Sequence, residues 1–215
     1  MTARCLLYYI TDRNGFSGDA ATRRRTLIAK ITEAARAGVD YIQLREKDLC
    51  ARELQGLAAD ALAAIRSESQ ATRLLVNSRL DVALAEAADG VHLRSDDISP
   101  SDVRSVMSRS EMTAADRFLI GISCHSEAEV RNAAEEGASF AVFGPVFEKV
   151  ASVEAMPMGL LKLKDACRHE IPVLALGGVT VKNASACLEA GASGVAGIRL
   201  FQDHEVAKVI ERLRA

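Results

Sequence analysis

The chain has 215 residues, of which 49% are hydrophobic and 26% are charged. This composition is typical of a soluble globular protein with a large buried core, and it argues against intrinsic disorder. The formal net charge is -2, with Lys and Arg spread along the chain, which gives no overall attraction to nucleic acid or to an anionic membrane. Any phosphate group that the protein binds must therefore be held by a local cluster of residues.

The five cysteines are odd in number, widely spaced and outside any C-x-x-C or Cys/His ligand pattern. This arrangement argues against a disulfide framework or a zinc site, and it favours a reducing, cytoplasmic location. The apolar run at residues 5–10 is too short for a signal peptide, and no apolar segment approaches the roughly 20 residues that cross a membrane. We therefore expect an untargeted protein without membrane contact.

Short apolar runs alternate with Ala-rich amphipathic stretches along the chain. The candidate strands are residues 6–11, 41–45, 73–77, 90–93, 118–123, 140–144, 172–177 and 194–198. The candidate helices, with apolar residues three and four apart, are residues 20–37, 50–68, 79–87, 100–109, 126–136, 159–168, 180–189 and 204–214. Strand and helix alternation with short connections implies a parallel sheet, and eight such units predict an α/β fold, a (β/α)8 TIM barrel with one domain over residues 1–215. No G-x-G-x-x-G motif follows the first strand, which argues against dinucleotide binding.

The segment Gln43 to Lys47 places polar residues at the end of the second candidate strand. In a barrel, the carboxyl ends of the strands meet at one rim, where barrel enzymes carry out their chemistry. Alternation puts Gln43 and Arg45 on the same side of the strand, where the barrel interior is ordinarily apolar. With Lys47 they suit a phosphorylated ligand, because Arg makes forked contacts with phosphate and Lys supplies a point charge. An internal ion pair or a solvated strand end is the alternative interpretation.

The last two candidate strands end in the sequences ALGGVT and GVAGIRL, and each is followed by a helix. Glycines there allow backbone N–H groups to approach an anion, and the loops after strands seven and eight form the recurrent phosphate site of barrels. The candidates are Gly177, Gly178, Ala196 and Gly197, with Arg199 as reinforcement. A tight turn explains a lone Gly-Gly equally well, but the pairing on adjacent strands favours phosphate.

Acidic and hydroxyl residues follow the fourth and fifth candidate strands. Asp96 and Asp97 stand where a carboxylate could hold Mg²⁺ bound to a diphosphate, although they also suit the approach to a helix N-terminus. Ser123 and His125 are two apart on an extended segment, which gives no hydrogen-bonding geometry between them, and no orienting acid is evident. Acyl transfer is therefore a poor interpretation, and substrate contact or proton transfer by His125 is a better one.

With these residues identified, the chain resembles the thiamine phosphate synthase family and its relatives, the TenI-like thiazole tautomerases. The similarity runs from YYITDR to GVAGIRLF and is most specific at YIQLREKD, ADGVHL, GISCHS, FGPVF and IPVLALGGVT. The resemblance implies a transferase that joins a hydroxymethylpyrimidine diphosphate to a thiazole phosphate, giving thiamine phosphate and diphosphate in thiamine biosynthesis. It also implies Mg²⁺ as a cofactor. Barrels of this type are monomers or homodimers, and the sequence is compatible with both.

The same resemblance implies roles for individual residues. The pyrimidine diphosphate would be held by Gln43, Arg45, Lys47, Asn77 and Ser123. Asp97 would ligate Mg²⁺. The thiazole phosphate would bind to Gly178 and to the backbone of Ala196, Gly197 and Ile198, and Lys149 would supply a cation from the loop after the sixth strand.

Two positions depart from the synthase pattern. The synthases have Asn-Asp after the third strand, with the Asp as a metal ligand, and Ser78 replaces that Asp here. They carry Thr-x-Thr-Lys after the sixth strand, whereas this chain reads GPVFEKVASVEAM with Lys149 as the only cation. Both departures favour a tautomerase, in which His125 would transfer a proton on a thiazole carboxylate phosphate without metal. The complete QLREK and Asp97 favour the synthase, which we expect. A non-catalytic thiazole phosphate-binding barrel is the third alternative, and the polar rim argues against it.

Overall fold

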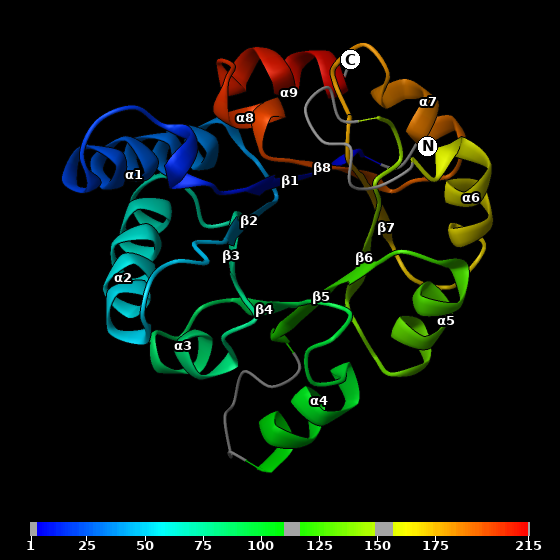
Figure 1. Cartoon of the computed structure of the whole chain (residues 1–215), viewed down its shortest axis with the longest axis horizontal. Helices are drawn as coiled ribbons and strands as arrows, with labels where there is room; N and C mark the ends of the chain where they lie inside the picture. Colours follow the sequence, from blue (N-terminus) through cyan, green and yellow to red (C-terminus); the bar gives the residue numbers. More distant parts are fainter. Residues whose placement is uncertain (1–3, 110–116, 149–156, 215) are drawn as a thin grey trace.

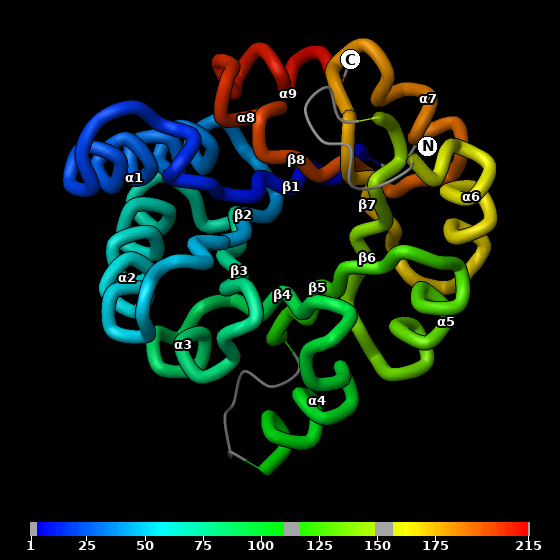
Figure 2. The backbone as a smooth tube through the Cα atoms, in the orientation of Figure 1, coloured from blue at the N-terminus to red at the C-terminus, as the bar shows by residue number. Residues whose placement is uncertain are grey.

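The computed structural model describes residues 4–109, 117–148 and 157–214. Eight parallel strands form a closed barrel in chain order, and β8 pairs with β1 to complete it. Helices form a ring around the strands, and the chain passes once around the barrel from the N-terminal to the C-terminal end of the sequence (Figures 1 and 2). The (β/α)8 barrel predicted from the alternation of strands and helices is confirmed.

The strands are β1 Leu6–Ile10, β2 Tyr41–Leu44, β3 Arg73–Asn77, β4 Gly90–Leu93, β5 Leu119–Cys124, β6 Phe140–Phe143, β7 Val173–Leu176 and β8 Gly194–Gly197. The helices are η1 Arg13–Gly15, α1 Ala20–Ala37, α2 Ala51–Glu68, α3 Leu80–Ala85, α4 Pro100–Arg109, α5 Glu127–Glu135, α6 Gly159–Ala166, α7 Ala184–Glu189, α8 Arg199–Gln202 and α9 Val206–Arg214. Each predicted strand and helix has its counterpart, whereas the short η1 and α8 were not predicted.

The helix ends follow the local sequence. Ser126 precedes α5, and its hydroxyl accepts the N–H of Glu129, which satisfies a backbone donor that the helix leaves unpaired. Gly38 ends α1 in the left-handed conformation at a φ of 89°, where a residue without Cβ has the lowest cost. No helix in the described part of the chain is long and apolar enough to span a membrane.

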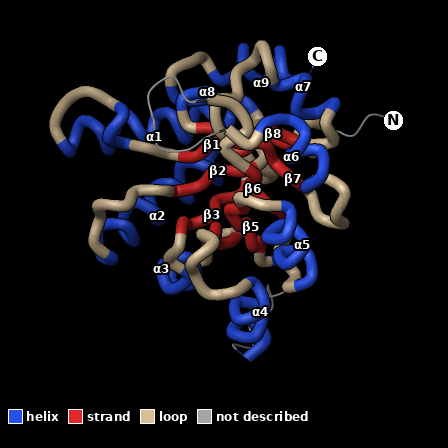
Figure 3. Tube along the Cα trace, turned by 45° about the vertical axis from the view of Figure 1, so that its right-hand side comes forward, coloured by secondary structure: helices blue, strands red, loops and turns tan. Residues whose placement is uncertain are grey.

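The barrel interior is filled by side chains from most of the strands. The strands lie inside the layer of helices (Figure 3). Tyr8 meets Phe140 edge to face at 5.3 Å between ring centroids, and Phe140 stacks on Tyr41 at 4.9 Å. Ile10, Leu174 and other apolar residues complete this interior cluster. Because the interior is packed, a ligand can enter only above the cluster, at the carboxyl ends of the strands.

Candidate functional site

A cavity of about 790 Å³ lies at the carboxyl ends of the strands. Its volume suits one or two small organic molecules. The predicted site residues that line it are Gln43, Arg45, Lys47, Asn77, Ser123, His125, Gly178, Ala196, Gly197 and Ile198. The structure therefore brings these residues together, while their roles in binding stay predictions. Lys149 lies outside the described residues.

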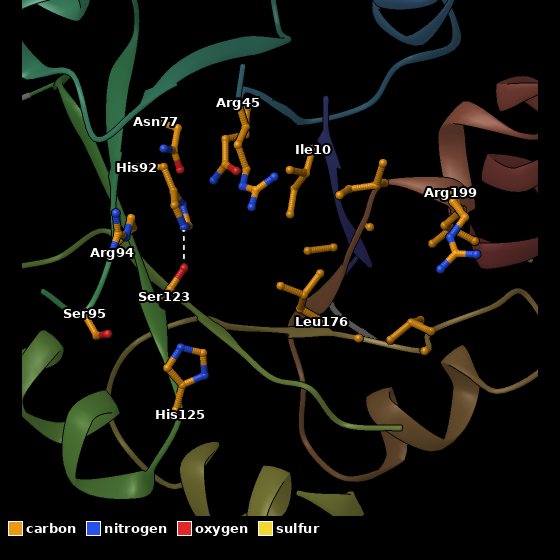
Figure 4. Close-up of a pocket in the computed structure, with 18 of the residues that line it drawn as sticks. Ile10, Arg45, Asn77, His92, Arg94, Ser95, Ser123, His125, Leu176 and Arg199 are labelled. Carbon is orange, nitrogen blue, oxygen red and sulfur yellow. Dashed lines mark hydrogen bonds between the residues drawn. The ribbon is translucent and has the colours of Figure 1, made fainter. Parts of the chain in front are cut away.

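The lining residues fall on two sides of the cavity (Figure 4). The first side, which we call the cationic rim, consists of Gln43, Arg45, Lys47, Asn77, Arg94 and Ser123. The second side, which we call the glycine rim, consists of Gly177, Gly178, Ala196, Gly197, Ile198 and Arg199. Ile10 and Leu176 lie between the two sides in the close-up view. The cavity thus has two polar ends joined by an apolar strip.

Arg45 and Lys47 extend from the end of β2 into a region of like charge. Burial is the largest cause that lowers the pKa of Arg45. The negative charges of Asp12 and Glu46 oppose this shift, and the positive charge of Arg94 adds a smaller lowering. The positive charge of Arg45 is the largest cause that lowers the pKa of Lys47, followed by burial and by Arg94. These directions show cations close enough to repel one another. An anion bound between them would remove that repulsion.

A network of hydrogen bonds holds the backbone of Arg45 in place. The hydroxyl of Thr11 accepts the N–H of Arg45 at 2.9 Å and donates to Glu46 at 2.7 Å. Glu46 is 5% exposed and also accepts from the guanidinium of Arg13 at 3.0 Å. Burial raises the pKa of Glu46, and the hydrogen bonds from Thr11 and Arg13 oppose that shift. The network ties the end of β2 to the segment that follows β1.

Ser123 is linked to a buried chain of polar groups. The amide of Gln43 donates to the Tyr8 hydroxyl at 3.2 Å, and that hydroxyl lies 3.2 Å from Nδ1 of His92. Nε2 of His92 lies 2.9 Å from Oγ of Ser123, as the dashed line in Figure 4 shows. Among these groups, the only tautomer of His92 that leaves the Tyr8 proton with an acceptor has Tyr8 donating to Nδ1 and Nε2 donating to Ser123. The hydroxyl proton of Ser123 is then available to a ligand.

His92 is neutral at physiological pH. It is 2% exposed, and burial, with a further contribution from Arg45, lowers its pKa to about 3. A neutral imidazole can accept at one nitrogen and donate at the other, which the chain from Tyr8 to Ser123 requires. His92, which also lines the cavity, thus orients the hydroxyl of Ser123.

His125 and Ser123 do not form a pair, as the sequence indicated. Nδ1 of His125 lies 2.7 Å from the carbonyl oxygen of Gly144, and a carbonyl can only accept, so Nδ1 carries a proton. In the neutral ring, Nε2 is then an acceptor. His125 lines the cavity, where this nitrogen can take up a proton from a ligand.

The segment after β3 turns away from the cavity. Ser78 has a φ of 57°, and its N–H donates to the carbonyl of His92 at 2.8 Å. The amide of Asn77 donates to the Ser78 hydroxyl at 3.1 Å. Among the described lining residues Asn77 is present and Ser78 is not. The strand thus ends with Asn77 facing the ligand space and Ser78 supporting it.

Asp96 lines the cavity, whereas Asp97 does not. A carboxylate oxygen of Asp97 accepts the backbone N–H of Arg94 at 2.8 Å, so Asp97 closes the turn after β4. In the described part of the chain no group of three or more His, Cys, Asp or Glu side chains forms a metal site. The second carboxylate oxygen of Asp97 is not used in this turn, so one protein carboxylate is left for a hard cation such as Mg²⁺, which would need further oxygen ligands from a diphosphate.

The glycine rim depends on backbone conformations that other residues rarely adopt. Gly177 and Gly178 have φ values of 93° and 64°. A Cβ on Gly178 would lie 2.6 Å from the carbonyl oxygen of Glu148 and 2.7 Å from Cβ of Phe147. The loop after β7 therefore packs against the loop after β6 in a way that only glycine allows, in the position where barrels bind phosphate.

Several lining residues were not predicted. Arg94, Ser95 and Glu148 follow β4 and β6, and Leu176 and Thr180 belong to the end of β7 and its loop. Arg94 occupies the same position after its strand as Arg45 does after β2. Its location at a strand end was the signal that could have identified it.

Comparisons with known proteins agree with this geometry. The sequence model of the family described as thiamine monophosphate synthase matches residues 7–201. A thiamine-phosphate synthase of Methanoculleus marisnigri is 38% identical over 194 residues, which are 89% of this chain and 85% of that protein. A thiamine-phosphate synthase of Roseiflexus castenholzii is 37% identical over 199 residues, which are 92% of this chain and 81% of that protein.

Solved structures give the same result. The thiamine phosphate pyrophosphorylase from Pyrococcus furiosus has a TM-score of 0.79 and 30% identity, and the match covers 97% of this chain and 93% of that one. A 3-hexulose-6-phosphate synthase has a TM-score of 0.68 at 16% identity and shows a shared fold alone. By its sequence match over most of its length and by these relatives, the chain belongs to the thiamine monophosphate synthase family.

Proposed function

We propose that the protein is a thiamine phosphate synthase, a transferase that joins hydroxymethylpyrimidine diphosphate to a thiazole phosphate. The observation that carries this proposal is the cavity with two polar ends, one cationic and one built from glycine loops, on either side of an apolar strip. Two phosphorylated heterocycles can bind in it together, with one phosphate group at each polar end and the two rings over the apolar strip. The relatives named thiamine-phosphate synthase support the same assignment.

The cationic rim holds the pyrimidine diphosphate. Arg45 and Lys47 are the cations for its phosphates, and Ser123 donates its free hydroxyl proton to them. Gln43 is 2% exposed at the floor of the cavity and contacts the ring of the substrate. Asn77 adds a further contact from the end of β3. The diphosphate thus rests on charge-assisted hydrogen bonds from several strands.

The chemistry needs a stabilised leaving group more than a base. The bond between the pyrimidine methylene carbon and the diphosphate oxygen breaks, and its electron pair leaves with the diphosphate. The carbocation that remains is stabilised by the pyrimidine ring, and the lone pair of the thiazole nitrogen forms the new C–N bond. No proton is transferred in this sequence, so the protein contributes by stabilising charge and by positioning the two partners.

The glycine rim holds the thiazole phosphate. Gly178 and the backbone of Ala196, Gly197 and Ile198 surround the monophosphate, and Arg199 adds a cation on the same side. The apolar side chains of Ile10 and Leu176 lie between the two rims, where the rings meet. Fixing both rings in one cavity converts a reaction of two molecules into one within a complex.

We also propose that Mg²⁺ is the cofactor, held by the second carboxylate oxygen of Asp97 together with the diphosphate oxygens. When bound, the ion supplies a Lewis acid that neutralises charge on the leaving diphosphate. The five cysteines are free, which supports a cytoplasmic location.

The test is to incubate the purified protein with both phosphorylated substrates and Mg²⁺ and to measure thiamine phosphate. We expect product formation that Arg45→Ala abolishes and that His125→Ala largely retains. A parallel sample receives the thiazole carboxylate phosphate alone, and its tautomers are followed by NMR. Isomerisation lost in His125→Ala, without thiamine phosphate in any sample, would identify a tautomerase and overturn the proposal. Ligand binding without turnover would indicate a non-catalytic barrel.

A further inference from the structure

Arg94 stands at the start of the loop that follows β4. Its backbone N–H donates to Asp97 at 2.8 Å, and the N–H of Asp97 donates to the Arg94 carbonyl at 3.2 Å. These two bonds close a turn and fix the direction in which the side chain leaves the strand. Arg94 lines the cavity on the cationic rim, and its side chain is 52% exposed.

The charge of Arg94 reaches the two cations on β2. It lowers the pKa of both Arg45 and Lys47, though it is the main cause in neither case. Three positive charges therefore face one side of the cavity, and Asp96 is the acidic residue that lines it on the same loop. A diphosphate carries enough negative charge to interact with all three.

The present partner of Arg94 is easily exchanged. Its guanidinium donates to the carboxylate of Asp96 at 2.5 Å, and the two side chains are 52% and 65% exposed. An ion pair between exposed groups contributes little to stability, because water and salt screen it. A phosphate oxygen in the cavity can replace this carboxylate and gain a forked contact with the guanidinium.

We propose that Arg94 is a third cation for the diphosphate, which exchanges Asp96 for phosphate oxygens when the substrate binds. The inference rests on the proposed function for the identity of the anion. It adds a binding residue on β4 to the two on β2, so the leaving group is held from both sides of β3. Asp96 is the residue that keeps the guanidinium at the cavity edge before the anion arrives.

The chain offers a matched control in Arg79. Its guanidinium pairs with Asp81 at 2.5 Å, two residues further along the chain, as Arg94 pairs with Asp96. Both arginines follow a strand of the barrel, but Arg79 does not line the cavity in the described structure. Arg79→Gln therefore removes the same net charge and the same kind of ion pair without touching the proposed contact.

The experiment is a calorimetric titration of the full chain with inorganic diphosphate, in EDTA and again with Mg²⁺. In EDTA we expect Arg94→Gln to raise the Kd about 5- to 10-fold and Arg79→Gln to change it less than about 2-fold, because a charged hydrogen bond is lost only in the first. Asp96→Asn should lower the Kd, because it removes a competing anion. Arg94→Lys should give an intermediate Kd, and thermal melting checks that each variant folds.

The inference would be overturned by an unchanged Kd in Arg94→Gln, by an equal loss of affinity in Arg79→Gln, or by no measurable binding of the wild type in EDTA. Weaker binding by Asp96→Asn with Mg²⁺ alone would instead identify Asp96 as a metal ligand and contradict the exchange. The thiamine phosphate assay separates this test from the proposed function. If no thiamine phosphate forms but Arg94→Gln weakens diphosphate binding, the proposed synthase activity alone is refuted. If thiamine phosphate forms and Arg94→Gln leaves the Kd for diphosphate unchanged, the inference about Arg94 alone is refuted.

Discussion

The cationic rim and the glycine rim surround one cavity but are built from different parts of the chain. The cationic rim consists of side chains at the ends of β2 to β5, where Arg45 and Lys47 repel each other and Ser123 is oriented by buried groups. The glycine rim consists of loops after β7 and β8, where the backbone of Gly177 and Gly178 has positive φ values. One side thus presents charge, and the other presents close-packed backbone.

The difference matches what each side has to do in the proposed reaction. The diphosphate gains negative charge as its bond breaks, so groups that bind it more tightly in the transition state accelerate the reaction. The thiazole phosphate keeps its charge and serves as an anchor. A rigid backbone site is sufficient to anchor the thiazole phosphate. The cations of the cationic rim repel one another before the substrate binds, and they stabilise the negative charge that develops on the diphosphate as its bond breaks.

The largest effect should come from Arg45→Ala. The substitution removes a partly buried cation whose backbone is held by Thr11. We expect kcat/KM for the pyrimidine diphosphate to fall by about 100-fold or more, because a charged contact to the leaving group is lost. Initial rates of thiamine phosphate formation, with each substrate varied in turn, measure this. Arg36→Ala, in an exposed ion pair with Glu68, is the control. An equal loss for both variants would contradict the assignment.

Gly178→Ala should produce the next largest effect, and on the other substrate. The new Cβ would lie 2.6 Å from a carbonyl oxygen, so the loop must move. We expect the KM for the thiazole phosphate to rise about 10- to 30-fold with a smaller change for the pyrimidine diphosphate, because the loss of one backbone hydrogen bond to a charged phosphate costs about 1.5–2 kcal/mol.

Gly137→Ala is the matched control for that variant. Gly137 has a φ of 80°, and a Cβ there meets no atom within 4 Å. Its substitution should cost about 1 kcal/mol of stability from the backbone conformation, with both KM values unchanged. If Gly178→Ala raises both KM values equally, the two rims do not act separately.

The contrast between the rims also explains what the sequence could predict. Gln43 and Arg45 were identifiable because alternation places them on the interior face of their strand, where polar side chains are unusual. The glycine loops were identifiable through their position after the last two strands. Both inferences need only the order of the strands, which the repeated pattern of apolar runs established.

Contacts between strands could not be predicted in the same way. The bond from His92 to Ser123 depends on the stagger of β4 against β5, where His92 pairs with Gly121 and Ser123 lies two residues further. The sequence predicted Asp97 as a metal ligand, and it gave no sign that one carboxylate oxygen also closes a turn on the N–H of Arg94. The four-residue helix α8 is too short for a periodic pattern to reveal. These three features depend on the stagger of neighbouring strands and on the conformation of short segments, and the pattern of apolar residues contains neither.

A third test examines the buried support of the cationic rim through its pH dependence. His92 has a pKa of about 3 in the folded protein, against about 6.5 in an unfolded chain. Between these values the unfolded chain binds a proton that the folded protein does not, so the free energy of unfolding falls as the pH falls below 6.5. At pH 5 this amounts to about 2 kcal/mol, at about 1.4 kcal/mol for each pH unit.

Urea unfolding at pH 7 and pH 5 measures this loss in the wild type. His92→Gln keeps a donor and an acceptor but cannot be protonated, so we expect a smaller loss of stability between the two pH values. His204→Gln, at an exposed position, should retain the wild-type loss. The same loss in His92→Gln and in the wild type would show that His92 is not the buried neutral group.

The smallest effect should come from Tyr8→Phe, which tests whether the buried chain orients Ser123. The Tyr8 hydroxyl lies 3.2 Å from His92, and its loss leaves Nδ1 without that donor, so the imidazole can place its proton on either nitrogen. We expect kcat to fall about 5-fold with little change in the KM for the thiazole phosphate, because one neutral hydrogen bond is worth about 1 kcal/mol.

Ser123→Ala should lower kcat more than Tyr8→Phe does. In the double variant, Tyr8→Phe should have no further effect, since there is no hydroxyl left to orient. Additive effects of the two substitutions would show that the Tyr8 hydroxyl acts independently of Ser123, through its hydrogen bond with Gln43.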